Sequence, residues 1–288
     1  MTTLESSGPN AEQIDYWNQQ GGPKWVELHA LIDAQIEPLG LMAMDRSEIS
    51  PGDRVLDVGC GCGATSLELA RRVGPDGHVM GVDISQPMLE RARGAAAQAG
   101  LGNVRFAQSD AQTGSLDATS FDVLFSRFGV MFFADPVAAF ANLRAALRAG
   151  ARLSFVCWQA IQENPWMVVP MGAVLQHIPP PPVPAPHAPG PFAFADPDRV
   201  SGILTEAGFD DVRLESIRET LTVGGSGGLD EAVDFLLQIG PTGRILRDSD
   251  PALTPKVAAS VRQALEPYHG DEGLRMPSAA WIVTARNR

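Results

Sequence analysis

The sequence feature that most constrains the fold is a cluster of glycines between a short apolar run and an amphipathic segment. Residues 54–58 read Arg-Val-Leu-Asp-Val and predict a buried strand, whereas residues 63–73 have the apolar spacing of a helix. Gly59, Gly61 and Gly63 connect the two. Glycine permits a positive φ and a close approach of backbone to a ligand, and a helix start offers free N–H groups. We therefore predict a strand, a ligand-holding turn and a helix.

The same alternation of strand and helix continues along the chain. Strands that alternate with helices form parallel sheets with helices on both faces. We therefore predict an α/β fold with a doubly wound, Rossmann-like sheet. The further expected strands are 78–83, 103–108, 121–125, 151–158, 212–223 and 279–285. The further expected helices are about 85–100 (with Ser85 as its cap), 135–148, 196–208, 229–239 and 255–265.

Three segments depart from this alternation. Residues 1–50 read as amphipathic helices, which form either a packed N-terminal region or a helical lid over the ligand. Within a main domain of residues 51–288, inserts are expected at about 160–195 and 224–276. The first insert contains a proline-rich run at 179–186, which favours an extended conformation and is either a surface linker or a stiff part of a lid.

Charge and cysteine content limit which binding partners, metals and cellular compartment are expected. The chain has 22 Lys and Arg against 34 Asp and Glu, a formal net charge of −12. Nucleic acids and anionic membranes are bound through basic surfaces, so neither is an expected partner. The three cysteines, and an N-terminus without a signal peptide, predict a reduced, cytoplasmic protein. A zinc site needs about four ligands, so Cys60 and Cys62 are interpreted as turn residues and no metal is expected. No pattern specifies an oligomeric state.

Two carboxylates bear on which ligand the turn can hold. Asp83 stands 20 residues after Gly63, at the end of the second expected strand, where a carboxylate accepts from ribose hydroxyls. A nicotinamide cofactor is an alternative, because the glycines also fit the dinucleotide pattern. Asp57 inside the first strand would repel a pyrophosphate and suits a ligand with an ammonium group. Neither tyrosine is followed by lysine four residues later, as in short-chain dehydrogenases.

Four stretches together resemble the class I S-adenosylmethionine-dependent methyltransferases, especially the small-molecule enzymes of the ubiquinone and menaquinone biosynthesis type. They are residues 55–63, 81–85, 108–110 and 121–124. The resemblance implies a seven-stranded sheet with an antiparallel last strand and S-adenosylmethionine as cofactor. It also implies methyl transfer to a small, partly apolar acceptor by in-line displacement at the sulfonium methyl. A non-catalytic, cofactor-binding regulatory protein and a nicotinamide-dependent oxidoreductase remain the alternatives.

The resemblance also implies roles for individual residues. Asp57 and the glycine turn would hold the methionine part, Asp83 the ribose and Asp110 the adenine amino group. Ser126 would face the methionine part and the acceptor. The cofactor-binding residues implied are Asp57, Gly59, Cys60, Gly61, Asp83, Ile84, Met88, Asp110, Ala111 and Ser126.

Candidates for the acceptor pocket follow the fourth and fifth strands, because ligands bind beyond the carboxyl ends of strands in open α/β sheets. These candidates, with one from the N-terminal helices, are Trp17, Arg127, Phe128, Met131, Trp158 and Trp166. The alternative for the aromatic residues is packing in the hydrophobic core. Arg127 is either a clamp for an acidic substrate or a surface residue. His177, just before the proline run, is the candidate general base, with a structural histidine as the alternative.

Overall fold

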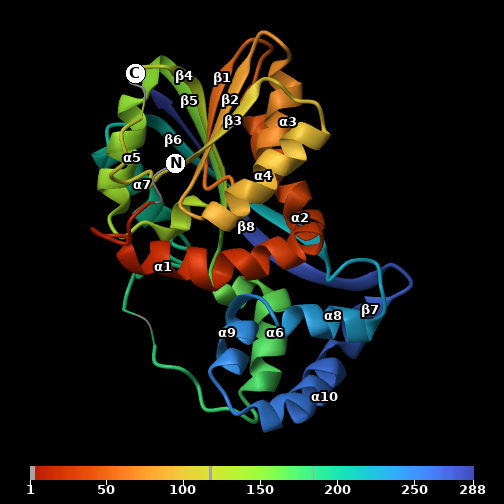
Figure 1. Cartoon of the computed structure of the whole chain (residues 1–288). Coiled ribbons are helices and arrows are strands. Elements are labelled where there is room, and N and C mark those ends of the chain that lie inside the picture. Colours follow the sequence, from red (N-terminus) through yellow and green to blue (C-terminus); the bar gives the residue numbers. More distant parts are fainter. Residues whose placement is uncertain (1–3, 117–118, 184) are drawn as a thin grey trace.

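A twisted sheet flanked by helices forms the larger part of the molecule (Figure 1). The computed structural model describes residues 4–116, 119–183 and 185–288. The strand order is β3-β2-β1-β4-β5-β8-β6, and the short β7 pairs with β8. The strands are β1 (Arg54–Val58), β2 (His78–Asp83), β3 (Val104–Gln108), β4 (Phe121–Arg127), β5 (Leu147–Trp158), β6 (Asp210–Val223), β7 (His269–Gly270) and β8 (Gly273–Asn287).

The direction of the strands confirms the Rossmann-like prediction. Strands β1 to β5 are parallel, and β8 runs antiparallel to both β5 and β6. The seven main strands thus include an antiparallel last strand, as the resemblance implied, and the two-residue β7 is an addition. Strand β8 begins at Gly273, six residues before the start expected from the sequence, and extends with β6 as a two-stranded ribbon beyond the sheet.

Helices cover both faces of the sheet. The helices α2 (Gly21–Arg46), α3 (Ala64–Val73) and α4 (Gln86–Gln98) pack on one face. The helices α5 (Pro136–Ala145) and α7 (Pro197–Glu206) pack on the other (Figure 1). Asp135 and Asp196 accept backbone N–H groups at the starts of α5 and α7. Ser85 precedes α4 as expected, but its hydroxyl donates to the carbonyl oxygen of Trp17 instead of capping the helix.

A small group of helices, here called the helical cap, lies beyond the carboxyl ends of the parallel strands (Figure 1). It consists of α6 (Pro165–Val174), α8 (Leu229–Leu236), α9 (Gly240–Arg247) and α10 (Thr254–Leu265). Helix α10 packs on α6 and α8, and α9 packs on α6. The sequence did not predict α9, because its first four residues include two glycines and a proline. Helix α1 (Ala11–Gln19) runs between the sheet and the cap (Figure 1).

The connection between α6 and α7 contains the proline-rich run. Its described residues at 179–183 and 185–186 are exposed and have no regular secondary structure, whereas residue 184 lies outside the described part. This exposure agrees with a surface linker. Short 3-10 turns complete the described elements at Val130–Phe132, Ile161–Glu163, Pro251–Leu253 and Glu266–Tyr268. Among the helices described, none is both long and apolar enough to span a membrane.

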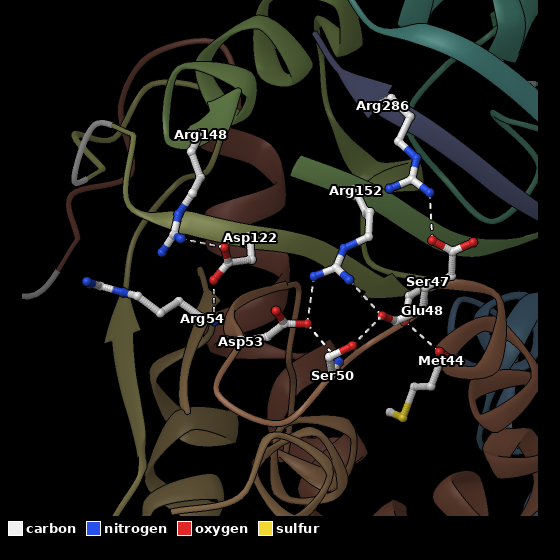
Figure 2. A network of polar contacts seen from close by, with 10 residues as sticks. All are labelled: Met44, Ser47, Glu48, Ser50, Asp53, Arg54, Asp122, Arg148, Arg152 and Arg286. Carbon is white, nitrogen blue, oxygen red and sulfur yellow. Dashed lines mark hydrogen bonds and ion pairs between the residues drawn. The ribbon is translucent and has the colours of Figure 1, made fainter. Parts of the chain in front are cut away.

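The amino ends of the parallel strands are held by ion pairs, and we call this side of the sheet the amino edge (Figure 2). Arg152 on β5 pairs with Asp53 at 2.6 Å and also donates to the carbonyl oxygen of Glu48 at 2.7 Å. Asp53 additionally accepts the backbone N–H of Ser50. Two further pairs are Arg148–Asp122 at 2.7 Å and Arg286–Glu48 at 2.6 Å. This edge therefore joins β1, β4, β5 and β8 through matched charges.

Candidate active site

A cavity opens at the other side of the sheet, beyond the carboxyl ends of β1, β2, β4 and β5. Its walls come from the glycine turn after β1, the loops after β2, β3 and β4, helices α1, α2 and α6, and the α8–α9 junction. One end is polar and contains the glycine turn, and the other is largely aromatic. Elements far apart in sequence thus meet where open α/β sheets bind ligands.

The glycine turn has a backbone that other residues would not adopt. Gly59, Gly61 and Gly63 have φ of +67°, +54° and +87°. A Cβ on Gly59 would lie 2.6 Å from the Cα of Gly129, and one on Gly63 would lie 2.8 Å from the Cβ of Ala92. Side chains are excluded by these contacts, so the turn presents bare backbone to the cavity. Gly59, Cys60 and Gly61 line it as the sequence predicted.

Asp83 stands next to this turn at the end of β2. Its Oδ2 accepts the backbone N–H of Gly61 and its Oδ1 accepts that of Ser85, each at 2.8 Å. Burial raises the pKa of Asp83, and these backbone N–H groups oppose that rise. A carboxylate has about four acceptor positions, so two remain for a ligand. Asp83 lines the cavity together with Ile84 and Met88.

Asp57 lies below the turn and does not line the cavity. Its side chain is fully buried, and its Oδ2 accepts the hydroxyls of Ser66 at 2.6 Å and Thr65 at 2.7 Å. Within the described residues, its Oδ1 has no partner. Burial raises the pKa of Asp57 to about 6, against the two hydroxyls that lower it. Thr65 does line the cavity, so Asp57 is linked to it through this hydroxyl.

Asp110 and Ala111 line the cavity after β3, but the Asp110 carboxylate is already engaged. Asn10 donates to both of its oxygens at 3.0 Å, and the Thr113 hydroxyl and Gln112 N–H donate as well. The Asn10 side chain also accepts from a backbone N–H after β4. Asn10 therefore joins the start of α1 to two strand ends. Sequence reasoning missed this residue, because nothing in its local pattern indicates a partner a hundred positions away.

The six acceptor-pocket candidates all line the cavity: Trp17, Arg127, Phe128, Met131, Trp158 and Trp166. The rings of Phe128 and Trp158 are stacked with centroids 4.1 Å apart, and Trp166 is 5.4 Å from Trp158. Phe128 has φ +59°, a conformation rare outside glycine, which fixes its ring against Trp158. The aromatic end of the cavity is therefore built from the ends of β4 and β5 and from α6.

Arg127 is not a free cation in this cavity. Its guanidinium forms an ion pair with Asp33 of α2, and both side chains are mostly buried. A Cβ on Gly40 would lie 2.8 Å from the Arg127 Cδ, so the bare helix face accommodates the arginine stem. Because Asp33 neutralises the positive charge of Arg127, the structure does not support Arg127 as a clamp for an acidic substrate.

Besides Asp57, two further predicted residues do not line the cavity. The Ser126 side chain is fully buried, donates to the Val58 carbonyl oxygen at 2.7 Å and accepts the Gly129 N–H. It braces the loop after β4 and does not line the cavity. His177 pairs through Nε2 with the Ser260 hydroxyl at 2.7 Å and joins the end of α6 to α10. The expectation that His177 is a base is therefore corrected to a structural role, because it does not reach the cavity.

Other lining residues had no signal in the sequence. They come mainly from the middle of α2 and from the α8–α9 junction, in the segments where the strand–helix alternation is absent. They are Asn10, Gln13, Ile32, Gln35, Ile36, Phe235, Ile239, Gly240 and Pro241. The described part of the chain holds no group of three or more His, Cys, Asp or Glu residues placed to bind a metal.

Comparisons with known proteins agree with this arrangement. Residues 49–180 match a family described as a methyltransferase domain. The chain is 41% identical over 118 residues to the aklanonic acid methyltransferase DauC of Streptomyces sp. (strain C5), covering 41% of this chain and 54% of that protein. It is 35% identical over 186 residues to the nocamycin O-methyltransferase of Saccharothrix syringae. This match covers 61% of this chain and 66% of that protein. The chain thus spans less than two thirds of these relatives' lengths.

The fold comparison covers more of the chain. The YcgJ protein from Bacillus subtilis is similar with a TM-score of 0.56 at 18% identity, over 88% of this chain and 98% of that one. The likeness in fold therefore covers more of the chain than residues 49–180. By sequence, residues 49–180 thus belong to the methyltransferase domain family, and the fold that contains them is shared with YcgJ over most of the chain.

Proposed function

We propose that this protein transfers a methyl group from S-adenosylmethionine to a small, partly apolar acceptor by in-line displacement at the sulfonium methyl. The observation that carries the proposal is Asp83, whose carboxylate keeps unused acceptor positions in the cavity beside the bare glycine turn. The sulfonium cofactor supplies an electrophilic methyl group when it is bound. The curated relatives named above are methyltransferases of small molecules by their names, which supports this reaction type.

The polar end of the cavity fits the cofactor. The backbone of Gly59 and Gly61 would hold the methionine part, and Asp83 would accept from the ribose hydroxyls. Ile84 and Met88 offer apolar contact for the adenine. Asp57 would act from below through its charge, because a ligand ammonium favours the ionised form of a buried carboxylate.

The N-terminal helices would act as a lid over this end. Asn18 of α1 donates to the Ile84 carbonyl oxygen and accepts the Gln86 N–H, each at 3.0 Å. With the Ser85 contact to Trp17, these bonds fasten α1 over the loop after β2. Asn10 engages Asp110, so α1 also orders the adenine end. These contacts support the proposed lid role of the N-terminal helices.

The chain's main contribution to the reaction would be to hold acceptor and methyl group together in a dry site. The aromatic walls of Phe128, Trp158 and Trp166 exclude water, and near-attack geometry alone supplies a large share of such rate enhancements. Among the described residues that line the cavity, there is no histidine. We therefore propose an acceptor whose nucleophilic atom reacts with little help from a protein base.

The partner we propose is a small molecule and not a nucleic acid, since the chain carries a net charge of −12 and its candidate site lies in a cavity. We also propose a cytoplasmic protein, because all three cysteines are buried and free.

Calorimetric titration with S-adenosylhomocysteine, NADH and NADPH tests the cofactor assignment. We expect micromolar binding of S-adenosylhomocysteine and none of the other two. Binding of a nicotinamide cofactor instead would contradict the proposal. Tight S-adenosylhomocysteine binding without transfer to a broad acceptor panel would favour a non-catalytic protein.

A further inference from the structure

Two residues that line the cavity each carry a buried polar atom that has no hydrogen-bond partner among the described residues. The atoms are the Oε1 of Gln35, in the middle of α2, and the Nε1 of Trp166, at the start of α6. Gln35 is 2% and Trp166 6% exposed, and both residues line the cavity. Five such atoms occur among the described residues, and two of the five belong to residues that line this one cavity.

Unpaired buried polar atoms lower stability, and folded proteins pair more than about 90% of them. Where they remain, a bound ligand is one way to satisfy them. The indole N–H of Trp166 is a donor and never an acceptor, so its partner must be an acceptor such as an oxygen. The Gln35 amide carries one acceptor and two donors, so it can pair with a hydroxyl as well.

The surroundings of these two groups define the rest of the ligand. Trp166 belongs to the ring series that starts with the stacked pair Phe128 and Trp158, which offers flat apolar surfaces. The nearby cation, Arg127, is neutralised by Asp33. A charged acceptor would therefore lose its hydration without gaining a free counter-ion. A neutral, flat molecule with oxygen substituents avoids this loss.

We propose that Trp166 and Gln35 select the methyl acceptor by its oxygen substituents. The Trp166 N–H donates to a carbonyl or hydroxyl oxygen, the Gln35 amide pairs with a second polar group, and the acceptor is a neutral ring compound. This inference rests on the proposed function, since it assigns the ligand of the same cavity. Both are specificity residues and take no part in the chemical step.

Paired probes that differ by one oxygen test the proposal. Each pair consists of a ketone and its parent hydrocarbon. The smaller pair is 1-tetralone and tetralin, and the larger pair is 9-fluorenone and fluorene. Their affinities are measured by calorimetry on the full chain saturated with S-adenosylhomocysteine. One hydrogen bond to a buried donor corresponds to about a three- to tenfold preference for the ketone. Equal binding of ketone and hydrocarbon, or binding of none of the four, would overturn the proposal.

Trp166→Phe keeps the ring and deletes the N–H, so the ketone preference should fall to about onefold. The matched control is Trp281→Phe, because the Trp281 N–H already donates to the Ala195 carbonyl oxygen at 2.9 Å and does not line the cavity. The control should keep the preference but lower the melting temperature. Trp166→Phe should lower the melting temperature less than the control does, since both variants shrink a ring but only the control loses a hydrogen bond.

Gln35→Met is the second arm, probed with 9-hydroxyfluorene and fluorene. We expect the preference for the alcohol to disappear in this variant. Its control is Gln159→Met, because the Gln159 amide is satisfied by Ser216 and the Ala280 carbonyl oxygen away from the cavity. A preference that survives in Trp166→Phe and Gln35→Met would contradict the assignment. Loss of S-adenosylhomocysteine binding in the parent protein would instead contradict the proposed function.

Discussion

The two edges of the sheet use their polar groups in opposite ways. At the amino edge, Asp53 and Asp122 are each paired with an arginine and also accept a backbone N–H (Figure 2). At the carboxyl edge, Asp57 keeps an oxygen without a partner, and Asp83 keeps unused acceptor positions. The same strands thus connect the amino edge, where charges are paired, to the carboxyl edge, where polar groups remain free to bind a ligand.

This contrast separates stability from binding within one sheet. Changes at the amino edge should lower the free energy of unfolding and leave ligand affinity intact. Changes at the carboxyl edge should mainly alter affinity or its pH dependence. The following experiments test this division.

The largest effect is expected from Asp83→Ala. Loss of charge-assisted hydrogen bonds to the ribose should weaken S-adenosylhomocysteine binding by about 1.5–3 kcal/mol, or roughly 10- to 150-fold in Kd by calorimetry. Asp122→Ala is the matched control, because this carboxylate also accepts a backbone N–H but lies at the amino edge. The control should lower stability and keep the affinity. An Asp83→Ala affinity within twofold of the parent would disprove the role of Asp83.

Asp57 should make the free energy of unfolding depend on pH. Its folded pKa of about 6 lies above the unfolded value of about 3.9, so the folded state holds this proton more tightly. The resulting stabilisation is complete below pH 4 and is lost as the pH rises through 6. Relative to Asp57→Asn, the parent's free energy of unfolding should fall by about 2 kcal/mol from pH 4 to 7. Urea unfolding of both proteins measures this difference, and a pH-independent difference would refute the prediction.

Arg152→Met should have a smaller effect, confined to stability. Arg152 and Asp53 have side chains 18% and 13% exposed, so breaking this pair should cost about 1–2 kcal/mol of unfolding free energy. Arg286→Met removes a pair whose side chains are 38% and 64% exposed, and it should cost less than about 0.5 kcal/mol. Neither change should alter S-adenosylhomocysteine affinity. A weakened affinity in either variant would show that the two edges are coupled.

The sequence predicted the part of the molecule whose structure depends on local patterns. The β-branched run 54–58, the three glycines and Asp83 each follow from spacing and chain geometry, and the structure has them as expected. The antiparallel direction of the last strand followed from the resemblance. Most of the polar end of the cavity was therefore accessible from the sequence.

The acceptor end depends on contacts between distant segments. Gln35 lies in a helix that reads as ordinary amphipathic sequence, and its unpaired oxygen is visible only once α2 faces the cavity. The Asn10–Asp110 contact and the pairing of Arg127 with Asp33 are likewise tertiary. Ser126 and His177 show the converse error, because a position after a strand or before a loop does not determine where a side chain points.

The place of β8 bears on how the protein is made. This strand is the last in the sequence, yet it lies between β5 and β6, with Ala151 opposite Asn287. During synthesis, β1 to β5 can pair as they emerge, whereas β6 has no neighbouring strand until β8 arrives. Joining such distant segments slows folding. A nascent chain would hence assemble β1 to β5 first and carry an open strand edge on β5 until β8 is translated.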